Sequence, residues 1–111
     1  GRVLLAGLMP DAAERVIAAS RPEPRTPKTV TSRATLRAAV DQARETGWAI
    51  VDEELELGLR SLSVPLRGRG GMTLGALNIC GPTARVSLEE LRTRFLGELL
   101  DAAARIQAAL E

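Results

Sequence analysis

The sequence of 111 residues contains no histidine and no tyrosine, a single cysteine and a single lysine. Imidazole is the usual base of hydrolytic triads and the commonest ligand of catalytic zinc, so its absence excludes most familiar hydrolase and zinc mechanisms. The lysine, Lys28, lies in a polar segment with prolines on both sides, where we do not expect the desolvation that activates a catalytic amine. We therefore predict that the chain is not an enzyme and holds neither a metal nor a cofactor.

Aromatic residues make up 2% of the chain, and they are Trp48 and Phe95. The core must therefore consist of aliphatic side chains, and stacking platforms for single-stranded nucleic acid are excluded. The formal net charge of +1 gives no long-range field that would attract a phosphate backbone. No apolar run approaches the ~20 residues of a membrane span, and Cys80 has no partner for an internal disulfide. We expect a cytoplasmic chain that does not bind DNA tightly by itself.

The length and the hydrophobic content of 45% fit one compact domain with a single core. The chain begins at Gly1, without methionine and without a signal-like segment, so we expect a fragment of a longer polypeptide. We find no internal repeat and no low-complexity segment.

Apolar spacing and capping residues predict four helical segments. The proline-rich segment Ser20–Thr31 should form an extended connection along the surface. The predicted helices are Val3–Met9, Ala12–Ala19 opened by Pro10, a third helix that Thr31 or Ser32 caps and Gly47 ends, and a long last helix opened by the capping box of Ser87 and Glu90.

We predict a short strand over Trp48–Val51, a strand of mixed apolar and hydroxyl residues over Leu59–Leu66, and a returning strand over Met72–Cys80. The glycine-rich segment Arg67–Gly71 reverses the chain, so the last two strands should pair as an antiparallel hairpin. The apolar stripe of the last helix should cover the sheet. The fold class that follows is α+β, an α/β sandwich with a central antiparallel sheet flanked by helices.

The two-residue period of a strand places Ser61 and Ser63 on one face, and the same rule places Asn78 and Cys80 together on the returning strand. We predict that these four side chains line a pocket, because hydroxyl and amide groups orient a small carboxylic acid in an otherwise apolar site. An alternative remains open, in which the small residues lie where the last helix packs closely on the sheet.

Arg60 offers a bidentate partner for a ligand carboxylate, but strand alternation places it on the opposite face from the serines. There we expect it to pair with Glu53, Glu54 or Glu56. The acidic run Asp52–Glu56 lacks the alternating carboxylates and the glycine bend of a calcium loop, so we expect a solvated turn with some ion pairing.

Three segments together resemble a known family, and their order and spacing extend the resemblance over essentially the whole chain. They are Gly1-Arg2-Val3-Leu4-Leu5-Ala6, Gly58-Leu59-Arg60-Ser61-Leu62 and Ala76-Leu77-Asn78-Ile79-Cys80. These segments resemble the effector-binding domain of IclR-type transcriptional regulators. The branch that they resemble most responds to protocatechuate, 4-hydroxybenzoate and β-ketoadipate.

The resemblance implies a GAF-like or profilin-like domain in which residues 1–111 form the C-terminal part of a single effector-binding domain. Effectors of the family bind at positions that match Val51, Ser61, Asn78 and Cys80. Some carboxylate-sensing members carry an acidic residue at the position of Val51, so the aliphatic side chain here favours a larger, less polar ligand such as an aromatic acid.

The family also implies a homodimer or homotetramer that binds DNA through an N-terminal winged helix-turn-helix domain, which these residues do not include. We therefore expect a domain that senses an aromatic or dicarboxylic acid and modulates DNA binding. Two alternatives stay open. The next in rank is a dimerisation or interaction module without a ligand, and the last is an enzyme that uses carboxylates.

Overall fold

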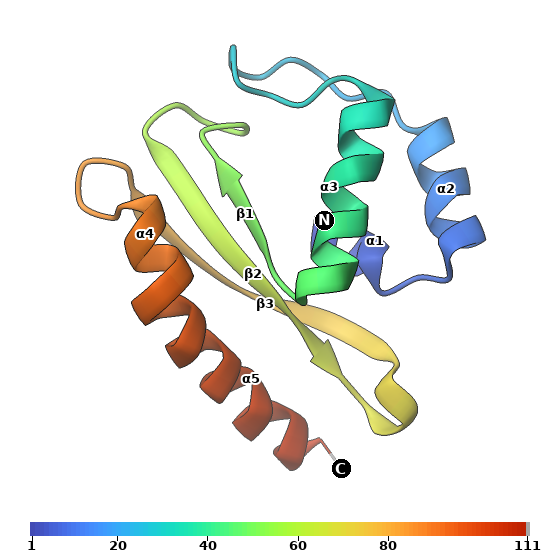
Figure 1. The fold of residues 1–111 in the computed structure, drawn as a ribbon, viewed down its shortest axis with the longest axis vertical. Helices are drawn as coiled ribbons and strands as arrows, with labels where there is room; N and C mark the ends of the chain where they lie inside the picture. The colour runs from blue at the N-terminus through green and yellow to red at the C-terminus, as the bar shows by residue number, and fades with distance from the viewer. Residues whose placement is uncertain (111) are drawn as a thin grey trace.

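The computed structural model describes residues 1–110. Three helices come first, followed by a three-stranded sheet and a long C-terminal helical segment (Figure 1). In chain order the elements are α1 (Arg2–Ala6), α2 (Pro10–Ala19), α3 (Arg33–Thr46), β1 (Ala49–Asp52), β2 (Leu59–Arg67), the 3-10 turn η1 (Arg69–Gly71), β3 (Thr73–Pro82), α4 (Leu88–Glu90), the π-helical turn η2 (Leu91–Phe95) and α5 (Leu96–Ala109).

The sheet is antiparallel in the order β1-β2-β3. Gly70 and Gly71 adopt φ angles of 74° and 81° between β2 and β3, a conformation that L side chains rarely adopt. The predicted hairpin across Arg67–Gly71 is thus confirmed, and so is the α+β class.

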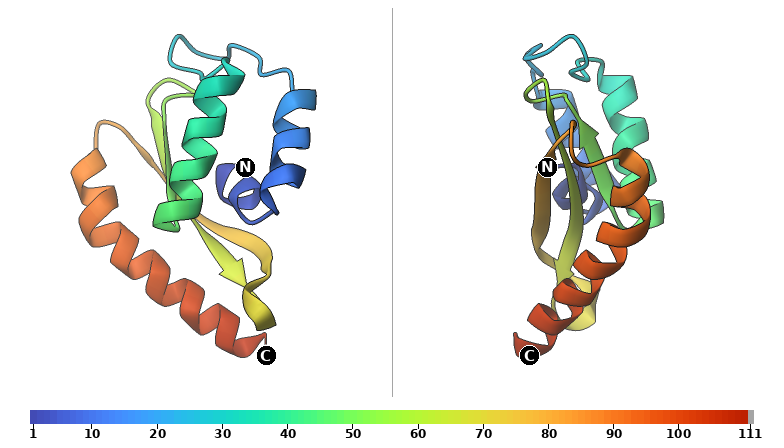
Figure 2. Two further views of the ribbon diagram at one scale, coloured as in Figure 1. Left: turned by 45° about the vertical axis from the view of Figure 1, so that its right-hand side comes forward. Right: turned by 90° about the vertical axis from the view of Figure 1, so that its left-hand side faces the viewer.

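One hydrophobic core cluster lies between one face of the sheet and the C-terminal helical segment, and further buried residues lie in α1, α2 and α3. Leu62 and Val64 of β2 are fully buried, at 0% exposure. They pack with Leu91, Leu99 and Ala103 from η2 and α5. Figure 2 shows that α3 lies on the same side of the sheet as α5, and α3 leaves β1 visible between them in Figure 1. The last helix therefore covers the sheet as predicted, but it covers only the aliphatic face.

Helix ends follow the predicted caps closely. Ser32, rather than Thr31, caps α3, because its Oγ accepts a hydrogen bond from the Thr35 amide. Gly47 ends that helix with a φ of 84°. The capping box of Ser87 and Glu90 is also present, so these three signals are confirmed.

Two helical predictions need correction. The first helix ends at Ala6 instead of Met9, because the Gly7 amide closes the last turn on the carbonyls of Val3 and Leu4. The last helix is not one continuous α-helix, since a π-helical turn at Leu91–Phe95 interrupts it. Among residues 1–110, none of the helices is both long enough and apolar enough to cross a membrane.

We predict that Leu62→Ala destabilises the domain by about 2–5 kcal/mol, since it opens a cavity at a fully buried position under α5. Leu74→Ala is the matched control, because Leu74 lies on the neighbouring strand and is 57% exposed. That control should change the free energy of unfolding by less than about 0.5 kcal/mol. Urea denaturation measures both values, and equal losses would contradict the placement of the core.

Candidate functional site

The strand register brings the five predicted site residues together on the sheet face opposite α5. Val51 of β1 lies across from Ser61 of β2, and Ser61 lies across from Cys80 of β3. Ser63 lies across from Asn78 in the neighbouring row. We call these five residues the open face. Two adjacent cross-strand rows therefore collect side chains that are separated in the sequence.

Hydrogen bonds connect the polar side chains of the open face. The Ser63 hydroxyl donates to Asn78 Oδ1 at 3.0 Å, and Asn78 Nδ2 donates to Cys80 Sγ at 3.1 Å. Within residues 1–110 the Ser61 hydroxyl has no such partner, so both its proton and its lone pairs are available to a ligand. Val51 and the two serines are half-buried, whereas Asn78 and Cys80 are exposed.

In the structure, the small residues of the open face do not pack under the last helix, as the alternative interpretation had them. Leu62 and Val64 point to α5, and the alternation of β2 turns Ser61 and Ser63 away from it. Along β3 the exposed positions alternate in the same way, with Leu74, Ala76, Asn78 and Cys80 exposed and the residues between them half-buried. The open face is thus accessible over β3 in the described part of the chain.

Arg60 lies on the other face of β2, as the alternation predicts. Its Nε donates to Asp52 Oδ1 at 2.9 Å, and one terminal nitrogen donates to the Val86 carbonyl at 2.8 Å. The acidic partner is Asp52 and not one of the three glutamates that we expected. The reason is register, because Asp52 lies directly across from Arg60 in the sheet. With a side-chain exposure of 14%, Arg60 is held as a link between β1, β2 and the segment before α4.

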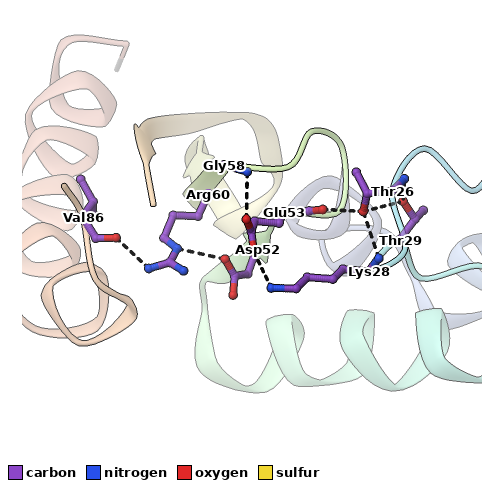
Figure 3. A network of polar contacts seen from close by, with 8 residues as sticks. All are labelled: Thr26, Lys28, Thr29, Asp52, Glu53, Gly58, Arg60 and Val86. Carbon is purple, nitrogen blue, oxygen red and sulfur yellow. Dashed lines mark hydrogen bonds and ion pairs between the residues drawn. The ribbon is translucent and has the colours of Figure 1, made fainter. Parts of the chain in front are cut away.

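A polar contact that the sequence did not indicate joins the proline-rich connection to the acidic turn (Figure 3). The Thr26 hydroxyl donates to the Glu53 carbonyl at 2.6 Å, and the Thr29 hydroxyl donates to the Glu54 carbonyl. Lys28 forms an ion pair with the Glu53 carboxylate. We call this set of contacts the clasp. Thr26 is buried at 9% exposure, so this part of the connection is not a free surface segment.

The acidic turn is more ordered than the predicted solvated turn. Glu53 has a φ of 57°, the only positive value among the non-glycine residues described. Its carboxylate also accepts a hydrogen bond from the Gly58 amide at 2.9 Å. The hydrogen bond from Lys28, followed by that from Gly58, holds the pKa of Glu53 below its usual range. On the other side of the turn, Glu54 pairs with Arg2 of α1.

Metal binding and a disulfide find no support in the described part of the chain. In residues 1–110, no group of three or more His, Cys, Asp or Glu side chains is placed to hold a metal ion. Cys80 is a free, exposed thiol. The groups that the open face offers are hydroxyl, amide, thiol and aliphatic, with no charged side chain among its five residues. Such a face can orient a ligand by hydrogen bonds, but it has no nucleophile with an adjacent base.

Fold and site together define an α+β domain with one packed and one open sheet face. The family model described as the C-terminal domain of the bacterial transcriptional regulator IclR matches residues 1–108. The chain therefore belongs to the C-terminal domain family of IclR-type transcriptional regulators. The family that the sequence resembles is confirmed by this match.

Individual relatives agree with the branch that the sequence resembles. The Pca regulon regulatory protein of Pseudomonas putida is 39% identical over 92% of this chain and 35% of its own length. A transcriptional regulator from Rhodococcus sp. RHA1 superimposes with a TM-score of 0.94 at 40% identity, covering 98% of this chain and 44% of that one. The inducer-binding domain of PobR from Acinetobacter, a double mutant solved in complex with 3-hydroxybenzoic acid, gives a TM-score of 0.89 at 29% identity, with 96% and 61% covered.

We predict that Glu53→Gln lowers stability most at neutral pH. A lowered carboxyl pKa in the folded state contributes stability above the unfolded pKa, and this contribution is lost as the pH falls through the folded value. The difference in unfolding free energy between the parent and the variant should therefore shrink as the pH falls below 4.5, the ordinary value for this carboxyl.

Glu56→Gln is the control for this experiment, since Glu56 lies exposed in the same turn and forms no ion pair within residues 1–110. Thermal unfolding of the three proteins between pH 3 and 8, a window of about five units around the carboxyl range, measures the effect. Identical pH profiles for the two variants would show that the clasp does not stabilise the fold through the Glu53 carboxylate.

Proposed function

We propose that this chain is the C-terminal part of an effector-binding and oligomerising domain, and that the open face binds a small aromatic or dicarboxylic acid. The observation that carries the proposal is the register that aligns Val51, Ser61 and Cys80 in one row and Ser63 with Asn78 in the next. A ligand lying across these rows would contact all three strands at once.

The chemistry of the open face supports an acid with an apolar body. The Ser61 hydroxyl and the second proton of the Asn78 amide are available as donors, and neutral donors fix oxygen atoms without the cost of burying a second charge. Val51 offers an aliphatic surface beside them, which suits an aromatic ring. The PobR domain, a relative of the same fold, was solved with 3-hydroxybenzoic acid, a molecule of this kind.

The whole protein would act through a second domain. The chain spans 35% of the length of the Pca regulon regulatory protein, and we propose that a winged helix-turn-helix domain elsewhere in the polypeptide binds the operator in the cytoplasm. Effector binding would alter subunit packing in a homodimer or homotetramer and so change operator affinity. This coupling requires that the effector binds two states of the protein with different affinities.

A second function, a dimerisation module without a ligand, is favoured by exposed apolar side chains along the C-terminal helical segment. Leu100, Ile106 and Leu110 are exposed by 46%, 37% and 59%, and alanines lie among them in the sequence. Apolar side chains beside small residues allow close helix contact between subunits. This surface and the open face lie on different sides of the structure, so the two functions are tested separately.

We expect protocatechuate, 4-hydroxybenzoate, 3-hydroxybenzoate or β-ketoadipate to raise the melting temperature saturably. A ligand present at 100 times its Kd stabilises the folded state by about 2.7 kcal/mol, because it binds the folded chain and not the unfolded one. Differential scanning fluorimetry gives the shift and calorimetry gives the Kd. A panel without any shift would favour the dimerisation module.

Ser61→Leu should abolish ligand binding at the open face, and therefore reduce the ligand-induced shift, while it leaves the ligand-free melting temperature nearly unchanged. The larger side chain fills the centre of the open face without touching the aliphatic core. Thr35→Leu is the matched control, since Thr35 is exposed on α3, away from the sheet face in question. Thr35→Leu should bind the ligand as the parent does. Full ligand affinity in Ser61→Leu would contradict the assigned site.

A further inference from the structure

A separate cavity of about 230 Å³ lies on the covered side of the sheet, between α3, β1 and the segment α4–η2. Trp48 and Ile50 line it from the sheet side, Gln42 and Thr46 from α3, and Arg92 from η2. Figure 1 shows this region, where β1 is visible between α3 and α4. Sites for drug-sized ligands measure roughly 300–1,000 Å³, so this cavity suits a molecule with a single ring.

Most polar groups around the cavity already have partners. Arg2 pairs with Glu54 and donates to the Ile50 carbonyl. The Thr46 hydroxyl lies 2.9 Å from the Gln42 carbonyl and 3.0 Å from the Trp48 carbonyl. Asp52, which also lines the cavity, is paired with Arg60. These charges are balanced locally and do not require a ligand.

Two side chains in the cavity wall differ from the others. In the described part of the chain, the Arg92 guanidinium and the Gln42 side-chain amide take part in no hydrogen bond or ion pair. Arg92 is carried by the π-helical turn η2, a feature that is rare in proteins and frequent at functional sites. Both residues are exposed, so the Arg92 charge and the Gln42 amide are solvated where they line the cavity, and a ligand can reach them there.

We propose that this cavity binds a one-ring aromatic carboxylate, at a site distinct from the open face. The carboxylate lies on the Arg92 guanidinium, which binds such groups through two parallel hydrogen bonds, and the Gln42 amide donates a further bond. The ring packs against the indole of Trp48. Ser61 and its neighbours lie on the other side of the sheet and take no part. The inference does not rest on the function proposed for the open face.

Trp48 is the only tryptophan of the chain, so its fluorescence reports on this cavity directly. The probe is 4-nitrobenzoate, a one-ring acid whose nitro group quenches indole fluorescence. We expect saturable quenching that fits one site. The neutral analogue 4-nitrobenzamide has the same ring and quencher without the charge, so it should bind about tenfold more weakly or worse.

Three variants separate this site from the open face. Arg92→Gln should weaken 4-nitrobenzoate binding by about tenfold or more, and Arg92→Lys should lie between this variant and the parent, because lysine keeps the charge without the planar fork. In Ser61→Leu, 4-nitrobenzoate should quench Trp48 fluorescence with the same affinity as in the parent. Circular dichroism of each variant confirms that the fold is retained.

Three outcomes would overturn the proposal. One is quenching that rises linearly with concentration and is the same in Arg92→Gln, which indicates collisions only. Another is saturable quenching that Ser61→Leu abolishes and Arg92→Gln does not, which places the probe on the open face. The third is equal affinity for the acid and the amide, which shows that Arg92 does not recognise the carboxylate.

Discussion

The alternation of side chains along β2 is the constraint on which the rest of the structure depends. Leu62 and Val64 are fully buried under α5, and Ser61 and Ser63, which alternate with them, point the other way. A slip of one residue would bury both hydroxyls and expose both aliphatic side chains. A buried hydroxyl without a partner costs about 1–3 kcal/mol, so the aliphatic core fixes the register. The same register gives the open face its composition.

Polar contacts at the end of β1 join the α2–α3 connection and the segment before α4 to this sheet. Arg60 links Asp52 to the Val86 carbonyl, and the clasp attaches the α2–α3 connection to the turn between β1 and β2. Both sets of contacts lie at the end of the short strand β1, which within residues 1–110 pairs with β2 alone. A sheet edge held in this way keeps Val51 in line with Ser61, and a binding site needs such support from the residues behind it.

Local signals in the sequence predicted much of this architecture, and long-range contacts account for most of what they missed. Ser32, Gly47 and the Ser87 capping box act within one helical turn, and strand alternation acts within one strand, so both can be recognised without knowledge of the fold. The hydrogen bond from Thr26 to Glu53 spans 27 residues, and the pairing of Arg60 with Asp52 depends on the exact register. The π-helical turn was missed because the apolar stripe of the last helix continues across it. Four residues of the open face could be predicted to lie together because they need only two alternating strands, and the family resemblance added Val51. The cavity near Trp48 needs three elements to be placed in space.

Both proposed binding sites include residues of β1, one on each side of the sheet. Any coupling between ligand binding at the two sites would therefore pass through this strand. Val51 faces the open side, while Ile50 lines the cavity beneath α3. A ligand on one side changes affinity on the other only if β1 has two arrangements that the ligand distinguishes, and the effect is then reciprocal. The pairing of Asp52 with Arg60 holds one end of β1, and the hydrogen bond from Thr46 to the Trp48 carbonyl holds the chain at its other end. Coupling would therefore have to move a strand that is held at both ends, and Trp48 lies where that strand meets the wall of the cavity.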